Sequence, residues 1–157
     1  MVGLDGSHAS KAALAWAIGQ AARTEAVVEV VTAYYWFPMP IEQVDFKGLA
    51  THMAEDAILD AADQGVPVRI IAKVVQGNAA NVLLDAARGA ELLVVGSRGH
   101  GSVTGALLGS VSQHCVHHAT CPVVVVRDPG TDKPLQAGRS WAESSAEFIK
   151  VRAEGPG

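Results

Sequence analysis

The sequence predicts an α/β fold in which parallel strands form a single sheet with helices on both of its faces. Short β-branched apolar segments alternate along the chain with segments of helical character, the pattern of repeated strand–helix–strand units. The two most glycine-rich loops follow predicted strands, and sheets of this kind bind ligands outside the carboxyl ends of their strands. A length of 157 residues fits one domain with a sizeable core.

In the first half of the chain, breaker residues separate the predicted elements. The turn cluster Asp5-Gly6-Ser7 ends a short apolar segment and precedes an alanine-rich one. The aromatic and proline residues of Trp36–Pro40 cannot continue a central strand, and Gly65 closes the long helical pattern that follows. The predicted elements are therefore a strand at Val2–Leu4, a helix at Ser10–Arg23, a strand at Ala26–Tyr34 and a helix at Ile41–Gln64.

The second half of the chain continues the same alternation. Pro67 stands at the entrance of a strand, where a missing amide donor is tolerated, and Asn78 is a typical N-cap of a helix that Gly89 follows. The predicted elements are a strand at Val66–Val75, a helix after Asn78 to Arg88, a strand at Leu92–Val95, a glycine-rich loop at Gly96–Gly105, a helix from about Thr104 to His118 and a strand at Pro122–Arg127.

Composition and charge exclude several classes of function. The net charge is -4 and the basic residues are scattered, so nucleic-acid binding is not expected. Apolar runs such as Leu92–Val95 and Val123–Val126 are far shorter than a membrane helix. The first residues show no basic and apolar secretory pattern, and Cys115 and Cys121 fit buried thiols of a reduced compartment, so we expect a cytoplasmic protein.

The chain changes character after Arg127. A breaker cluster, Asp128-Pro129-Gly130-Thr131-Asp132, is followed by a segment with few large apolar residues. We therefore expect one domain at 1–127 and a C-terminal tail at 128–157, which is either disordered or forms a short amphipathic docking helix. Trp141, Phe148 and Ile149 are the apolar residues that such a helix would present.

The segment from Gly96 to Ser110 carries the clearest chemical signal. It leaves an apolar strand and enters a helix, and glycines at such a junction let backbone amides approach phosphate oxygens closely. No Gly-Lys-Ser/Thr follows, so the segment is not a P-loop, and a residue other than glycine, Thr104, stands where the dinucleotide fingerprint has its third glycine. These features predict an anion site of another type.

The spacing Gly96-x2-Gly99-x9-Gly109-Ser110 resembles the nucleotide-binding signature of the universal stress protein family. Two further blocks agree with this resemblance, namely the first strand running into Asp5-Gly6-Ser7 and the last strand, Cys121–Arg127. The resemblance covers residues 2 to 127. It implies a doubly wound, five-stranded parallel sheet of order 3-2-1-4-5, similar to the adenine nucleotide alpha hydrolase fold, a homodimer formed through the last strand, and binding of ATP.

The resemblance also implies which residues hold the nucleotide. Asp5 matches the acidic residue near the adenosine, and Ala33 stands where the second strand packs on adenine. The remaining matches flank the phosphates, at the end of the fourth strand and at both ends of the glycine loop: Val95, Gly96, Arg98, Gly99, Gly109, Ser110 and Val111. As loop residues, Arg98 is expected to meet phosphate charge and His100 to be solvated, although His100 too could contact phosphate.

The chain departs from the family pattern at its first strand. Family members carry several more apolar residues before the acidic position, whereas Val2–Leu4 is short. Either the chain begins at a late start codon or the sheet tolerates a truncated central strand. The tail after Arg127 is a second departure, about which the resemblance says nothing.

Three other chemistries are disfavoured by the residue pattern. His114, His117 and His118 share one helical face, but Cys115 is turned away from them and Cys121 opens the next strand, so no metal site is expected. A phosphoacceptor role for Asp5 lacks the paired acids and the lysine of receiver domains. Ser7 and His8 lack the acid and the oxyanion hole of a hydrolase, and a turn or N-cap role is simpler.

The sequence thus predicts a cytoplasmic, dimeric ATP-binding protein of the universal stress class, with the nucleotide as a regulatory ligand that arrives with Mg²⁺. Arg98 is the one cation evident beside the phosphates, so any hydrolysis should be slow. The alternatives are a nucleotide-independent dimeric interaction module, an enzyme that transfers an adenylyl or phosphoryl group, and a cyclic AMP-binding member of the same family. A protein partner is conceivable, and the sequence does not identify it.

Overall fold

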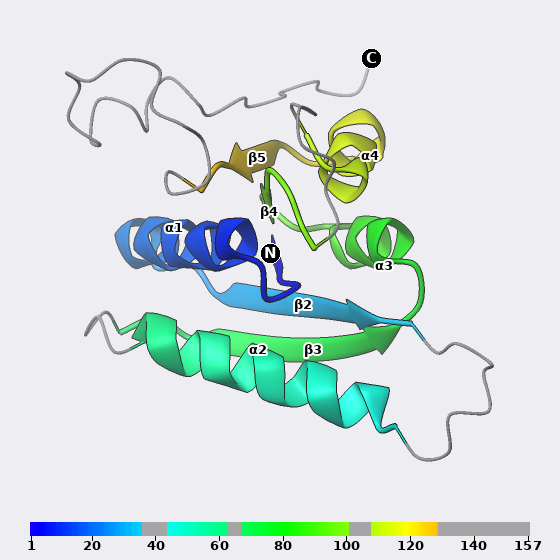
Figure 1. Cartoon of the computed structure of the whole chain (residues 1–157). Coiled ribbons are helices and arrows are strands. Elements are labelled where there is room, and N and C mark those ends of the chain that lie inside the picture. Colours follow the sequence, from blue (N-terminus) through cyan, green and yellow to red (C-terminus); the bar gives the residue numbers. More distant parts are fainter. Residues whose placement is uncertain (36–43, 63–66, 101–107, 129–157) are drawn as a thin grey trace, which may run out of the picture.

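The computed structural model describes residues 1–35, 44–62, 67–100 and 108–128 of the chain. In this part of the chain, five strands alternate with four helices (Figure 1). The elements are β1 (Val2–Gly3), α1 (His8–Thr24), β2 (Val28–Tyr34), α2 (Phe46–Ala62), β3 (Ile70–Gln76), α3 (Ala79–Ala86), β4 (Leu93–Gly96), α4 (Ser110–His118) and β5 (Val123–Val126).

The strands form one parallel sheet in the order β3-β2-β1-β4-β5, as the resemblance implied. The short β1 lies in the middle, where Val2 pairs with Val30 of β2 and with Val94 of β4. One more backbone bond extends this pairing, because Leu4 N donates to the Val31 carbonyl at 3.0 Å. The sheet therefore accommodates a short central strand, and its order reverses at β1, which is where a crevice opens in such folds.

Each face of the sheet contributes to a separate apolar core. Val30, Val94 and Val124 belong to the core beneath α1 and α2, whereas the next residue along each strand belongs to the core beneath α3 and α4. This alternation reflects the two-residue period of a strand, and burial on both faces explains why the strands are continuously apolar. Figure 1 shows α1 and α2 on one side of the sheet and α3 and α4 on the other.

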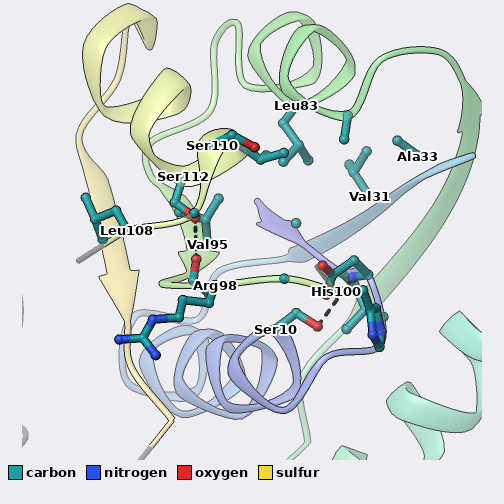
Figure 2. Close-up of a pocket in the computed structure, with 18 residues that line it drawn as sticks. Ser10, Val31, Ala33, Leu83, Val95, Arg98, His100, Leu108, Ser110 and Ser112 are labelled. Atoms are coloured by element: carbon teal, nitrogen blue, oxygen red, sulfur yellow. Dashed lines mark hydrogen bonds between the residues drawn. The ribbon is translucent and has the colours of Figure 1, made fainter. Parts of the chain in front are cut away.

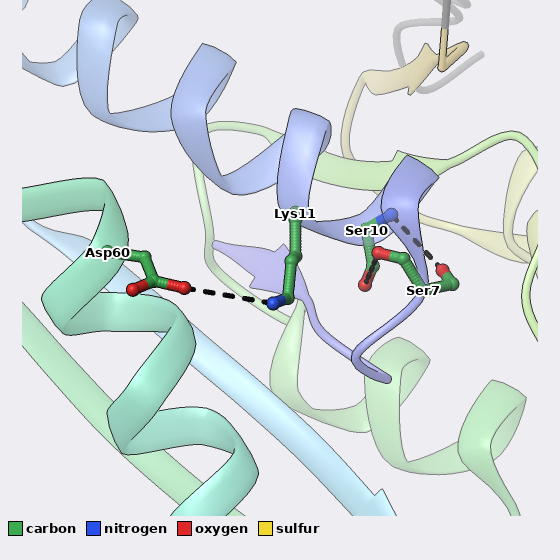
Figure 3. Close-up of polar contacts among 4 residues, drawn as sticks. All are labelled: Ser7, Ser10, Lys11 and Asp60. Atoms are coloured by element: carbon green, nitrogen blue, oxygen red, sulfur yellow. Dashed lines mark hydrogen bonds and ion pairs between the residues drawn. The ribbon is translucent and has the colours of Figure 1, made fainter. Parts of the chain in front are cut away.

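Helix α1 is fixed at its ends and against α2. The Ser7 hydroxyl accepts a hydrogen bond from Ser10 N at 3.2 Å, which makes Ser7 the N-cap that the sequence predicted (Figure 3). At the other end Glu25 adopts the left-handed conformation with φ of 55°. Lys11 Nζ lies 3.8 Å from Asp60 Oδ2 of α2, an exposed pair that contributes little stability (Figure 3).

Three predicted boundaries were wrong within the described residues. The prediction started the second helix at Ile41, but the described residues 44 and 45 are not helical and the helix begins at Phe46. The Asp45 carboxylate accepts a hydrogen bond from Gly48 N at 2.8 Å and so caps the helix at this point. The third strand begins at Ile70, since Ile70 pairs with Val28, the first residue of its neighbour. Residues 41–43 and 63–66, which the prediction also covered, lie outside the described part.

The fourth helix begins at Ser110, not near Thr104. Gly109 is extended, with φ of -69° and ψ of 158°, and its N–H donates to the Ser97 carbonyl at 2.7 Å instead of entering a helical turn. Residues 101–107 lie outside the described part. The other predicted boundaries differ from the structure by one or two residues, as helix and strand ends commonly do.

Candidate functional site

A pocket of about 360 Å³ opens at the carboxyl ends of β1, β2 and β4 (Figure 2). The first turns of α3 and α4 and the turn between β1 and α1 complete its walls. The position agrees with the rule that open α/β sheets bind ligands where the strand order reverses. Its volume is in the range of small-molecule sites.

All the residues that the sequence predicted for a nucleotide site line this one pocket. They come from four separate parts of the chain: Asp5, Ala33, Val95, Gly96, Arg98, Gly99, Gly109, Ser110 and Val111. The fold therefore brings them together, although their role in binding stays a prediction. His100 also lines the pocket and is exposed, as expected of a loop residue.

Asp5 is held in one orientation by the turn that follows β1. Its Oδ1 atom accepts hydrogen bonds from Ser7 N at 3.0 Å and from Ser7 Oγ at 2.6 Å. Its Oδ2 atom faces Gly99, where an added Cβ would overlap it. Because a carboxylate has further acceptor capacity, Oδ2 is placed to accept a hydrogen bond from a ligand hydroxyl or amino group.

The beginning of the glycine loop packs against α1 without space for a side chain. A Cβ at Gly96 would lie 2.7 Å from the carbonyl carbon of Ala9 and 2.8 Å from Ser10 N, both backbone atoms that cannot move aside. Ser7 Oγ also lies 3.3 Å from the Arg98 carbonyl, so the β1–α1 turn contacts the loop directly. Glycine at position 96 is therefore required by close packing.

The end of the glycine loop leads into the N-terminus of α4. Gly109 is the N-cap and gives no side-chain capping bond, while Ser110 is exposed at the first helical position. The first amides of a helix have no partner within it, and the helix dipole adds partial positive charge there. This end of the pocket is consequently suited to an anion, as the sequence predicted.

Two side chains of the loop extend in different directions. In Figure 2 the Arg98 guanidinium reaches toward the Leu108 side of the pocket, away from Ala33. The His100 ring lies on the opposite side, where its Nε2 atom would be 3.6 Å from a Cβ added at Gly6. The sequence expectation that Arg98 meets phosphate is thus compatible with its place in the lining but is not tested by it.

Sequence reasoning identified Ala33 but missed the other residues of the apolar wall of the pocket. Val31 and Ala33 project from one face of β2, and Ala79 and Leu83 lie one helical turn apart on α3. The two-residue period of a strand could have found Val31 from Ala33, whereas the place of Ala79 and Leu83 depends on how α3 docks on the sheet. The wall offers an apolar surface to a flat ring, with Leu83 beside Ser110 and Ala33 farther from α4 (Figure 2).

The histidines and cysteines near α4 form no recognisable metal centre. In the described part of the chain, no group of three or more His, Cys, Asp or Glu side chains could hold a metal ion. His114 and His118 stack with ring centroids 4.2 Å apart. Both cysteines are free thiols, and burial raises the pKa of Cys115 to about 11. Among the described helices, none is long and apolar enough to cross a membrane.

Comparison with known proteins identifies the family. The family model described as "Universal stress protein family" matches residues 1–127. A universal stress protein of Mycobacterium tuberculosis is 36% identical over 137 residues, which covers 81% of this chain and 44% of that protein. The chain thus spans about half the length of the curated relatives it matches.

Solved structures show the same fold. A universal stress protein solved in complex with cAMP is 28% identical with a TM-score of 0.65, and the match covers 81% of this chain and 94% of that one. UspA from Lactobacillus plantarum, at 24% identity and a TM-score of 0.66, matches 80% of this chain and 96% of its own. The fold is that of the adenine nucleotide alpha hydrolases, and this chain belongs to the universal stress protein family.

Proposed function

We propose that this chain binds an adenine nucleotide in the pocket between β1, β2 and β4, and that the nucleotide is ATP accompanied by Mg²⁺. The single observation that carries the proposal is that every site residue inferred from the sequence lines that one pocket. The related structure in complex with cAMP supports an adenine nucleotide as the ligand class. The nucleotide would act as a regulatory ligand in a stress response.

Each part of the pocket suits one part of such a ligand. The apolar wall with Val31, Ala33 and Leu83 would take the base. The Oδ2 atom of Asp5 would accept a hydrogen bond from the sugar or the base. The amides of Ser110 and Val111, together with the α4 dipole, would hold phosphate oxygens. Mg²⁺ commonly binds through substrate phosphates with few protein ligands, so it would arrive with ATP.

The pocket supports slow hydrolysis at most. Fast phosphoryl transfer depends on cations placed against the transferred group and on a residue that orients the nucleophile. Among the described residues that line the pocket there is one arginine, Arg98, and no lysine. A turnover well above about 1 per second would contradict a regulatory role for the nucleotide.

Cyclic AMP is the second candidate ligand, because the related structure contains it. The choice depends on how many phosphates the α4 end of the pocket accepts, and Ser110 with its neighbouring amides would accept either.

A nucleotide-independent interaction module is a further possibility. In both cases we propose a cytoplasmic homodimer formed along β5, which is the outer strand of the sheet and, among the described strands, pairs on one side alone.

The experiment measures bound and added nucleotides in the same preparation. Purified protein is denatured and the released small molecules are identified by mass spectrometry. ATP, ADP and cAMP are then titrated into the native protein, with and without Mg²⁺. The test variant is Gly109→Val. The fold should tolerate this substitution, because a Cβ at Gly109 makes only ordinary contacts of 3.4 Å or more and the backbone there suits any residue. Gly19→Ala, in α1 with open space around it, is the control.

We expect ATP to bind the wild type and the control and to lose most of its affinity for Gly109→Val. Tighter binding of cAMP than of ATP would favour the second candidate. If the folded wild type releases no nucleotide and binds none more tightly than about 1 mM, the pocket is not a nucleotide site. The interaction module would then be the better hypothesis, and sedimentation of the same sample would test the homodimer.

A further inference from the structure

Ser112 joins the two ends of the glycine loop. Its hydroxyl donates a hydrogen bond to the Gly96 carbonyl at 2.5 Å, across sixteen residues of sequence (Figure 2). A second bond runs beside it, from Gly109 N to the Ser97 carbonyl at 2.7 Å. Together they fasten the first turn of α4 to the carboxyl end of β4. Ser112 is 5% exposed and lines the pocket, so this contact is made away from bulk solvent.

The partner of this hydroxyl is unusual for its position. A serine in the first turn of a helix commonly bonds to backbone groups of its own helix or cap. Ser112 instead reaches a carbonyl of a different element. Ser10, the other serine that is buried in the wall of the pocket, follows the common pattern and bonds within the β1–α1 turn, to the Ser7 carbonyl at 2.9 Å.

The acceptor of the bond is itself closely packed and paired in the sheet. The Cα atom of Gly96 packs so closely on α1 that an added Cβ would meet the backbone of Ala9 and Ser10 at less than 3 Å. Val126 and Gly96 are also paired across β4 and β5. Because the Gly96 peptide is held from two sides, a bond to its carbonyl fixes α4 relative to the sheet.

This attachment determines where the anion-binding end of the pocket lies. Ser110 and Val111 begin α4, whereas Arg98 and Gly99 follow β4, and the phosphates of a ligand would contact both groups. Donors that are already in place lose less conformational entropy on binding than donors that must be ordered. Loss of the Ser112 bond would leave each group intact and would weaken their relative placement.

We propose that Ser112 is a positioning residue of the pocket, whose hydroxyl holds the N-terminus of α4 in register with the end of β4 for binding the nucleotide phosphates. The inference rests on the proposed function, since it concerns affinity for the same ligand. It adds to that function a residue outside the Gly96 to Val111 signature, one which acts through α4 and need not touch the nucleotide.

The test compares Ser112→Ala, which removes the donor, with Ser112→Thr, which keeps it. ATP affinity is measured by calorimetry, at a temperature at which circular dichroism shows that each variant is folded. We expect Ser112→Ala to bind about tenfold more weakly and Ser112→Thr to stay within about threefold of the wild type. Ala21→Gly, in the core at the far end of α1, is a control that loses thermal stability and keeps its affinity.

A second measurement needs no nucleotide. Hydrogen exchange of peptides covering 108–116 should be faster in nucleotide-free Ser112→Ala than in the wild type or in Ala21→Gly. Equal affinity of Ser112→Ala and wild type, or unchanged exchange in these peptides, would overturn the positioning role. If the wild type itself does not bind ATP, the proposed function fails. The exchange measurement would then still decide whether Ser112 fastens α4.

Discussion

At the scale of single residues, the pocket depends on glycines for different reasons. Gly96 is required by the α1 backbone, which leaves no room for a Cβ. At Gly99 an added Cβ would overlap the Asp5 carboxylate and displace it. At Gly109, by contrast, a Cβ would make ordinary contacts. Substitutions at these positions should therefore have distinct effects.

We predict that Gly99→Ala weakens ATP binding mainly through Asp5. The new methyl group must push the carboxylate away from its present place, and the two bonds from Ser7 would be lost or distorted. The affinity should fall about tenfold or more, as expected for the loss of a charge-assisted hydrogen bond. Calorimetry on Gly99→Ala and Asp5→Asn checks this. If the two changes add fully in the double variant, Gly99 does not act through Asp5.

A buried thiol predicts how stability depends on pH. Burial raises the pKa of Cys115 from 9.0 to about 11. Between pH 9 and pH 11 the Cys115 thiol loses its proton in the unfolded chain and keeps it in the folded chain. Its contribution to the stability of the fold is therefore complete below pH 9 and declines as pH rises. The free energy of unfolding should thereby fall by about 2 to 3 kcal/mol near pH 11.

Urea unfolding of the wild type and of Cys115→Ala from pH 8 to pH 11 measures this dependence. Other groups titrate in the same range, so the quantity to follow is the difference between the two proteins. Cys115→Ala is expected to be less stable than the wild type at pH 8, because its methyl group leaves part of a buried site empty. The gap between the two free energies of unfolding should narrow as pH rises. A gap that stays constant would show that Cys115 does not ionise as inferred.

At the residue scale, the family resemblance named site residues that follow a strand or begin a helix. The structure brings Asp5, Gly99 and Ser110 to one sheet edge, where parallel strands place their carboxyl ends together. Leu83 and Ser112 could not be assigned, because their place in the pocket depends on how α3 and α4 dock on the sheet. A single sequence contains the periodicity of a helix but not its docking angle.

At the scale of elements, the sequence predicted the number and order of strands and helices better than their ends. The start of β3 is determined by the strand beside it, since pairing begins at Val28 and Ile70. The start of α4 is determined by the bond from Gly109 to Ser97, a contact between distant residues. Local propensity does not contain either interaction, whereas the N-caps at Ser7 and Asn78 are local and were predicted correctly.

Helix α1 contains a position where propensity can be improved. Gly19 lies in its interior, and an added Cβ would meet no atom within 4 Å. Gly19→Ala should therefore raise the free energy of unfolding by about 0.5 to 1 kcal/mol, because glycine has more conformational freedom to lose. Thermal unfolding should shift upward by about 2 to 4 °C at most. A lower melting temperature would mean that α1 packs more tightly at Gly19 than the structure shows.

At the scale of the whole molecule, β1 joins the two halves of the sheet. It pairs with β2 on one side and with β4 on the other, and its two residues contribute to the sheet centre. Val2 is fully buried, and Gly3 accepts the Leu83 side chain so closely that a Cβ would lie 2.8 Å from it. The pocket forms where the chain leaves this strand, so the integrity of the sheet centre and of the site are linked.

The last prediction concerns the C-terminal segment 129–157. The family model ends at residue 127, and within the described part of the chain the residues of both cores and of the pocket lining all precede Asp128. We therefore expect a chain ending at Asp128 to keep its melting temperature within about 3 °C, since all of these core residues would be retained. Its ATP affinity should stay within about twofold.

Comparing the full chain with the shortened one distinguishes the two expectations for this segment. A disordered tail leaves melting and affinity unchanged. A docking helix built on Trp141, Phe148 and Ile149 would bury apolar area, and its removal would lower the melting temperature well beyond 3 °C, at about 25 cal/mol per Å² exposed. A drop in stability with unchanged affinity would place the docked helix away from the pocket, and a drop in both would place it beside the nucleotide.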